Sequence, residues 1–303
     1  MTRKTVFTLL YTIILLTGLQ AQEHQINRYP DGVMKEKIAM ADSQMHGTSY
    51  YYYPSGVIRE IASYYQGKLN GLQYQYYETG VLRESVNYTH NMRTGEMSNF
   101  YPSGMVKEQG FYQNGMYEGS FRTFYPDGKL LSLSETSKGV REGWSYEYHP
   151  NGAVSARVFF KNGLQQDSAF WYYPSGQLKS FYQFLDGKLH GESRDFYEDG
   201  ALRTIHPYQY NKSEGIVKTY YESGALKSEV PYSKSKREGV AKTFYENGTL
   251  WTQQLFANNN LNGETLIYRN NGSLWYRDHY EAGTLKKSSE YNEAGETVQS
   301  KEF

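Results

Sequence analysis

The sequence repeats itself every 24 residues. Glycine occupies one position of this period in eleven successive units, without a single shift in spacing. The column comprises Gly32, Gly56, Gly80, Gly104, Gly128, Gly152, Gly176, Gly200, Gly224, Gly248 and Gly272. A fixed period of this length is typical of repeat architectures, in which each unit packs mainly against its neighbours. The period therefore predicts one array rather than the two ordinary domains that 303 residues could form.

Each unit predicts a β-hairpin. The unit that begins at Gly47 has two strand-like runs, roughly 48–53 and 57–65, on either side of Pro54-Ser55-Gly56. Proline presets φ at the first turn position, and glycine accepts the left-handed conformation at the last. The tripeptide therefore predicts a three-residue turn with a bulge, which pairs Tyr53 with Val57.

Two further columns carry residues that tolerate positive φ. The column that includes Gly67 and Asn91 is rich in Gly and Asn, which adopt this conformation at the lowest cost. We expect it to form the second connection of each unit. The column that begins at Gly47 and Gly71 is nearly all glycine, with Asp167 as an exception. There we expect the backbone or an aromatic ring to approach closely.

The predicted hairpin also assigns side chains to faces. Tyr52 should lie opposite Ile58, and alternation along the strands then places Tyr64 on the same, apolar face. The columns that contain Tyr53 and Arg59 should lie on the opposite face. Aliphatic residues are sparse and there are 32 tyrosines, so tyrosine rings must supply much of the buried area.

These observations predict an all-β fold, an elongated single-layer antiparallel β-meander of about eleven 24-residue hairpin repeats. A basic start, an apolar run and small residues near Ala21 predict a signal peptide at 1–21. We expect an N-terminal capping or partial repeat at 22–46 and the repeat array at 47–286. Gly295 follows Gly272 by 23 residues, and we interpret 287–303 as a C-terminal capping hairpin.

The repeated motif resembles that of a known family. The pattern Tyr-Tyr-Pro-Ser-Gly-x-Ile/Leu-Lys/Arg, followed by Tyr-x-x-Gly-x-x-x-Gly, is similar to the bacterial variant of the MORN repeat. The resemblance covers nearly all of the chain after the predicted signal peptide. It implies a meander of MORN-like hairpins and a role in protein contacts or membrane-associated scaffolding. Members built only of these repeats are often labelled antitoxin-like, of the YwqK type.

The sequence offers no recognisable catalytic or metal-binding motif. Cysteine is absent, and the seven histidines occupy different repeat positions without ligand spacing, so we expect neither a metal nor a cofactor. There is no Gly-x-Ser-x-Gly elbow, and the glycines lack the strand–loop–helix context of a phosphate loop. We therefore predict that the chain is not an enzyme. A net charge of +0 also disfavours a nucleic-acid partner.

The alternation of phenols and cations defines a candidate binding face. Tyr and Arg are frequent anchors of protein interfaces. The alternative is a solvated sheet face whose Lys and Arg side chains prevent edge-to-edge association. The basic column is interrupted at Leu131 and Ser155 and ends in Trp251 and Trp275. The candidate residues are Tyr53, Arg59, Tyr77, Arg83, Tyr101, Lys107, Tyr173, Lys179, Tyr197, Arg203, Tyr221 and Lys227.

We predict an exported, non-enzymatic repeat scaffold that binds another protein at the bacterial envelope or outside the cell. Its address would be the periplasm, the outer surface or the medium. One alternative is an antitoxin-like or immunity-like protein that masks a toxin. Another is a module that binds cell-wall glycan, and a membrane surface is a further candidate partner.

Overall fold

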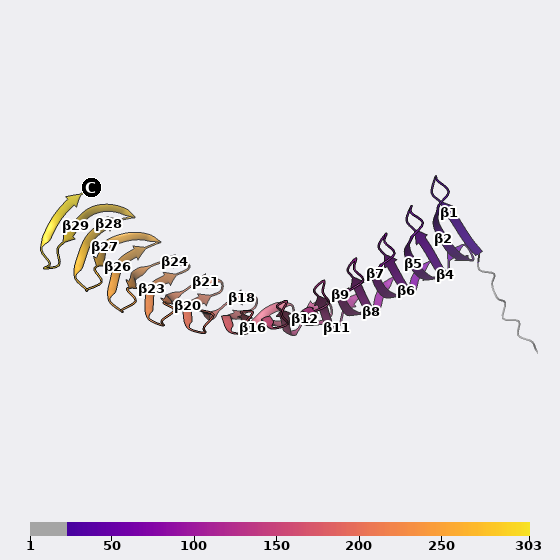
Figure 1. The fold of residues 1–303 in the computed structure, drawn as a ribbon, viewed down its shortest axis with the longest axis horizontal. Coiled ribbons are helices and arrows are strands. Elements are labelled where there is room, and N and C mark those ends of the chain that lie inside the picture. The colour runs from indigo at the N-terminus through magenta and orange to yellow at the C-terminus, as the bar shows by residue number, and fades with distance from the viewer. Residues whose placement is uncertain (1–22) are drawn as a thin grey trace, which may run out of the picture. The chain divides into compact units, whose positions relative to one another are not determined.

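The computed structural model describes residues 23–303 (Figure 1). These residues form only β-strands, turns and short connections, and the strands within each hairpin are antiparallel. The all-β class and the meander of hairpins are thereby confirmed. Nowhere in 23–303 is there a helix that could cross a membrane. The predicted signal peptide at 1–21 lies outside the described residues.

The chain divides after Met92 into two units, and each is an antiparallel meander. The strands of the first unit are β1 (Glu23–Arg28), β2 (Met34–Ala41), β3 (Gln44–Met45), β4 (Gly47–Tyr52), β5 (Ile58–Tyr65), β6 (Lys68–Tyr76) and β7 (Leu82–Thr89). Strand β8 (Met92–Phe100) begins at the division between the two units.

The second unit repeats the same hairpin along its whole length. Its further strands are β9 (Val106–Gln113), β10 (Met116–Tyr117), β11 (Gly119–Phe124), β12 (Leu130–Ser137), β13 (Val140–Arg141), β14 (Gly143–Tyr148), β15 (Val154–Lys161), β16 (Leu164–Tyr172), β17 (Leu178–Leu185), β18 (Lys188–Leu189), β19 (Gly191–Phe196), β20 (Leu202–Gln209), β21 (Lys212–Ser213), β22 (Gly215–Tyr220), β23 (Leu226–Ser233), β24 (Lys236–Arg237), β25 (Gly239–Phe244), β26 (Leu250–Ala257), β27 (Asn260–Tyr268), β28 (Leu274–Glu281), β29 (Thr284–Tyr291) and β30 (Thr297–Glu302). The two-residue strands are each separated from the next strand by one residue.

The first turn of each hairpin has the predicted geometry. The amide of Tyr53 donates to the carbonyl of Val57 at 2.8 Å, and the amide of Gly56 donates back to the carbonyl of Tyr53 at 2.9 Å. Gly56 has φ +84°, as the bulge requires. The strand register shifts between Tyr51 and Tyr52, so one strand holds an extra residue beside the turn.

The second connection is a two-residue turn that also ties neighbouring repeats together. Tyr65 pairs with Lys68, and the intervening Gln66 and Gly67 have φ of 48° and 76°. Positive φ at both positions is the type I′ turn, whose twist suits a hairpin. The amide of Gly67 donates to the carbonyl of Met45 in the preceding repeat at 2.9 Å.

The third glycine column lies at a second bulge. Gly71 has φ +111°, and Asp167 adopts φ +58° at the equivalent position. The expectation of close approach fails as a general rule. A Cβ on Gly71 would lie 3.0 Å from Ser63, but a Cβ on Gly119 would meet nothing within 4 Å. What the column shares is positive φ, which is why glycine dominates it.

The last repeat is one residue shorter than the others because its second bulge contains fewer residues. Between β26 and β27, residues 262–264 lie opposite Leu255 without regular pairing. Between β28 and β29 only Lys286 is left unpaired. The first turn is unaffected, because Gly295 keeps φ +83°. The shorter spacing therefore reflects a smaller bulge and not a different hairpin.

One face of the sheet holds most of the buried side chains, in columns that include Ser49, Tyr51, Ala62 and Tyr64. We call it the packed face. Ser49 and Ala62 are a cross-strand pair and both are fully buried. The Tyr51 hydroxyl lies 3.2 Å from that of Tyr64, and the guanidinium of Arg59 lies 5.9 Å from the Tyr51 ring.

Arg59 and Tyr64 therefore share the packed face. The prediction that placed them on opposite faces is wrong. It assumed continuous alternation from the turn to the strand end, and the extra residue beside Tyr52 breaks that alternation.

Candidate functional site

The tyrosine column of the predicted binding face joins neighbouring repeats. The hydroxyl of Tyr53 donates to the main-chain carbonyl of Tyr76, 23 residues later, at 2.8 Å. Equivalent hydrogen bonds of 2.7–3.0 Å are made by Tyr29, Tyr101, Tyr125, Tyr173, Tyr197, Tyr221 and Tyr245. Tyr77 occupies the same turn position, with its amide 2.8 Å from the Val81 carbonyl. These rings are half-buried, and the hydrogen bonds engage their hydroxyl groups within the sheet.

Two residues that replace tyrosine in this column also contact a main-chain carbonyl of the next repeat. At position 149 the imidazole Nε2 of His149 lies 2.9 Å from the carbonyl of Tyr172. At position 269 the guanidinium of Arg269 donates to the carbonyl of Tyr291 at 2.7 Å. A polar group at this position therefore recurs because a carbonyl of the next repeat needs a donor.

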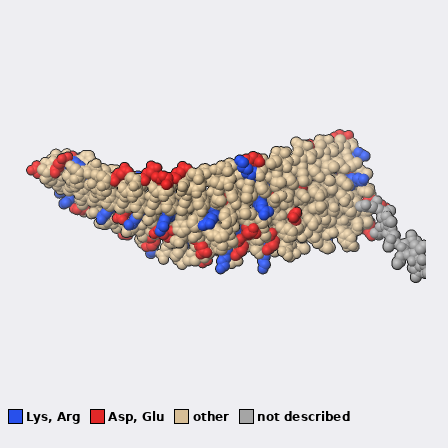
Figure 2. Space-filling model, turned by 60° about the horizontal axis from the view of Figure 1, so that its bottom comes forward, with Lys and Arg blue, Asp and Glu red and all other residues tan. Residues whose placement is uncertain are grey.

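The basic column is exposed and lies beside the tyrosines. Its candidate members are Arg59, Arg83, Lys107, Lys179, Arg203 and Lys227, and all six side chains are exposed. The ammonium of Lys179 lies 5.6 Å from the Tyr173 ring centre, and that of Lys227 lies 5.3 Å from Tyr221. Figure 2 shows cationic side chains as separate spots interspersed with acidic ones.

Several of these cations already have polar neighbours. Arg83 donates to Gln75, and Lys107 lies 3.9 Å from the Glu108 carboxylate. Arg203 lies 4.0 Å from the carboxylate of Asp195. The structure therefore brings phenols and cations together in a row along the first turns, with the cations as the exposed partners.

Trp171 marks a hollow that the sequence did not reveal. β16, β17 and β18 border an open, shallow concavity of about 580 Å³, which we call the Trp171 hollow. Trp171 and Tyr182 meet edge to face, with ring centres 5.2 Å apart at 89°. Its lining residues are Trp171, Lys179, Ser180, Tyr182, Phe184, Leu189 and Asn211. Rings and aliphatic groups thus border an open space, with one cation of the predicted face, Lys179, at its rim.

A second concavity lies on the other side of Trp171. It measures about 330 Å³, and both Leu131 and Ser155 line it, together with His149. Leu131 and Ser155 are the two interruptions of the basic column. The interruptions were therefore the sequence signal for this region, although spacing alone could not show that they border a concavity.

A hydrogen-bonded polar network lies beside the Trp171 hollow. Asp195 accepts hydrogen bonds from Ser180 at 2.7 Å and from Tyr182 at 3.2 Å. Burial raises the pKa of the Tyr182 phenol, and the charge of Asp195 raises it further. The Nε2 atom of His206 lies 2.7 Å from the hydroxyl of Ser213. Burial lowers the pKa of His206, against an opposing effect of Asp195.

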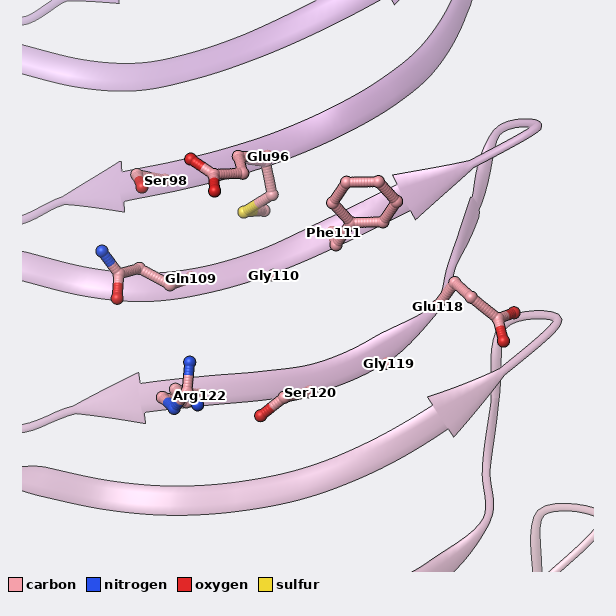
Figure 3. Close-up of a pocket in the computed structure, with 10 residues that line it drawn as sticks. Glu96, Ser98, Gln109, Gly110, Phe111, Glu118, Gly119, Ser120 and Arg122 are labelled. Carbon is pink, nitrogen blue, oxygen red and sulfur yellow. The ribbon is translucent and has the colours of Figure 1, made fainter.

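A third concavity is polar and lies among β8, β9 and β11 (Figure 3). Its volume is about 530 Å³, and Glu96, Gln109, Glu118 and Arg122 are among its lining residues. Phe111 at its margin is 45% exposed. Across 23–303, no three His, Asp or Glu side chains form a group that could hold a metal ion.

The fold and these rows define a β-hairpin repeat protein whose surface columns recur from one unit to the next. The family model described as MORN repeat variant matches residues 45–65, 69–90, 93–114, 117–137, 189–210, 213–234 and 237–258. The chain belongs to this family, as its repeated motif predicted. The YwqK-type, antitoxin-like label stays a prediction.

Other comparisons add little. No curated protein matches the chain. Three solved structures align with 93% of it: TcdB2-TccC3-Cdc42 (14% identity, TM-score 0.19), TcdB2-TccC3 (13%, 0.17) and the Photorhabdus luminescens Tc holotoxin pore with TccC3-D651A (14%, 0.21). The chain spans only 17%, 18% and 16% of the respective matched chains.

Proposed function

We propose that this chain is an exported, non-enzymatic scaffold that binds another protein at the bacterial envelope or outside the cell. Its hairpins form the frame, and the partner docks on the packed face at the Trp171 hollow. The observation that carries the proposal is this concavity of about 580 Å³, which rings and Leu189 border and Lys179 flanks. The signal-like sequence at 1–21 supports export.

The chemistry of the hollow indicates what it would accept. Trp and Tyr side chains contribute large contact areas at interfaces with little loss of conformational entropy. An apolar side chain of the partner would enter between Trp171 and Leu189. The exposed ammonium of Lys179 favours a carboxylate close to that side chain. We therefore expect a partner segment that combines one apolar anchor with neighbouring acidic residues.

To test this proposal, the purified chain is used to capture its partner from envelope extract, and mass spectrometry identifies the captured protein. Titration with the purified partner then gives the affinity of each variant. Trp171→Ala should weaken binding by about tenfold or more, as expected for a central anchor. Lys179→Glu should weaken it and reduce its salt dependence. Arg59→Glu is the matched control, because it reverses an exposed cation of the same column in the first unit.

Unchanged affinity in both Trp171→Ala and Lys179→Glu would exclude the hollow as the docking site. Export is tested separately by measuring the molecular mass of the chain recovered from the periplasm or the medium. A product that lacks residues 1–21 supports export, and retention of the intact chain in the cytosol contradicts it.

A further inference from the structure

Two exposed tryptophans end the basic column. Trp251 on β26 and Trp275 on β28 take the position that Arg or Lys occupies in most earlier repeats. Their side chains are 45% and 39% exposed. Both belong to the hairpins near the yellow end of the ribbon in Figure 1, where β27 separates their two strands.

Neighbouring groups hold each indole from one side. The ring of Tyr245 lies 5.6 Å from that of Trp251 at an angle of 32°. The guanidinium of Arg269 lies 5.2 Å from the Trp275 ring centre, and the indole N–H of Trp275 donates to Glu290 at 3.3 Å. Both rings are therefore supported, and much of each remains available to a ligand.

The repeat fixes the spacing of the two backbone positions that carry the rings. Equivalent positions of consecutive hairpins are two strands apart, which corresponds to about 10 Å. In an extended β-1,4-linked glycan, successive sugars alternate in orientation, so the same sugar face recurs once per disaccharide. That recurrence is close to the two-strand spacing, so one chain could stack a sugar on each indole.

We propose that Trp251 and Trp275 form a platform for a β-1,4-linked glycan that lies across β26, β27 and β28. Indoles in place of cations remove positive charge from both positions, and the cation that remains, Arg269, is engaged by the Trp275 ring and the Tyr291 carbonyl. Both features favour a neutral, hydroxyl-rich ligand over an acidic peptide. The Glu290 carboxylate offers a hydrogen-bond acceptor beside Trp275. Sugars combine an apolar C–H face with hydroxyl edges, and this platform presents a ring and a polar group together. The site is separate from the Trp171 hollow and does not depend on the function proposed there.

Titration of the full chain with soluble oligosaccharides tests the platform. The probes are cellohexaose and chitohexaose, their disaccharides, and the β-1,3-linked laminarihexaose. A β-1,4-linked hexasaccharide should bind about tenfold more tightly than its disaccharide, because only the longer chain contacts both rings. Laminarihexaose, whose sugar faces recur differently, should bind more weakly. Calorimetry gives the affinities, and indole fluorescence reports the contact.

Variants locate the site on the two rings. Trp251→Ala and Trp275→Ala should each weaken hexasaccharide binding by about tenfold. Trp144 lies in β14, away from the platform, so Trp144→Phe should leave binding unchanged. Lys227→Trp adds a third indole in the preceding repeat and should strengthen binding of longer chains. This gain of function remains informative if an alanine variant fails to fold.

Three results would overturn the proposal. The first is failure of both β-1,4-linked hexasaccharides to bind at millimolar concentration. The second is equal binding by folded Trp251→Ala and wild-type chains, with circular dichroism as the check on folding. The third is unchanged affinity for longer chains in folded Lys227→Trp.

Discussion

Gly110 provides a sharp test of how the packed face is filled. It lies within β9 and is not among the glycines with positive φ, so the backbone does not require glycine there. Its neighbours explain the residue. A Cβ at this position would lie 2.8 Å from the Phe121 ring and 3.3 Å from the Tyr117 ring. Phe121 is a large residue in a column that elsewhere holds Ser49 and Ala169, so the missing side chain of Gly110 makes room for it.

The substitution Gly110→Ala should have opposite effects in two backgrounds. In the wild type, overpacking costs about 1–3 kcal/mol. Removing a glycine from a strand returns about 0.5–1 kcal/mol, so the net destabilisation should be about 1–2 kcal/mol. With Phe121→Ala already present, the clash with that ring is gone and Tyr117 can shift. The same change should then stabilise the fold by about 0.5–1 kcal/mol.

Urea unfolding of the four proteins measures this double-mutant cycle. The expected coupling between positions 110 and 121 is about 1.5–3 kcal/mol, well above the error of additive behaviour. Far-UV circular dichroism and tyrosine fluorescence should give coincident transitions if unfolding is cooperative. Equal destabilisation by Gly110→Ala in both backgrounds would refute the argument that Phe121 requires glycine at position 110.

Three further substitutions test the tyrosine hydrogen bonds, the second bulge and the half-buried histidine. Tyr197→Phe removes the hydroxyl that donates to the Tyr220 carbonyl and should cost about 1 kcal/mol in urea unfolding; no loss would mean that water replaces the bond. Asp167→Gly should increase the free energy of unfolding by about 0.5–1 kcal/mol and so raise the urea midpoint, because aspartate there holds φ +58°. Because burial lowers the pKa of His206, the folded state resists its protonation. Stability should therefore decline as pH falls below about 6.5 and level off below the folded pKa, and His206→Gln should flatten that slope.

The period predicted the hairpins because each turn has its own chemistry. Pro54-Ser55-Gly56 and the Gly67 column specify backbone conformations that few other residues adopt, and the structure has both turns. The face assignment failed because the residue left unpaired beside Tyr52 is Arg59, and a cation in that column indicates exposure without showing that it interrupts the alternation. The tyrosine bonds were equally hidden, because their acceptors are main-chain carbonyls, which every residue has.

The region around Trp171 shows where a repeat array departs from its own rule. A family-model match ends at 137 and the next begins at 189, although the hairpins continue through 138–188. Backbone geometry therefore does not explain the divergence. Within that gap lie Ser155, Trp171 and Lys179, which line the two concavities. Since the hairpins persist where the family pattern is lost, the substitutions in this segment keep the fold while they change its surface, which favours a function specific to this segment.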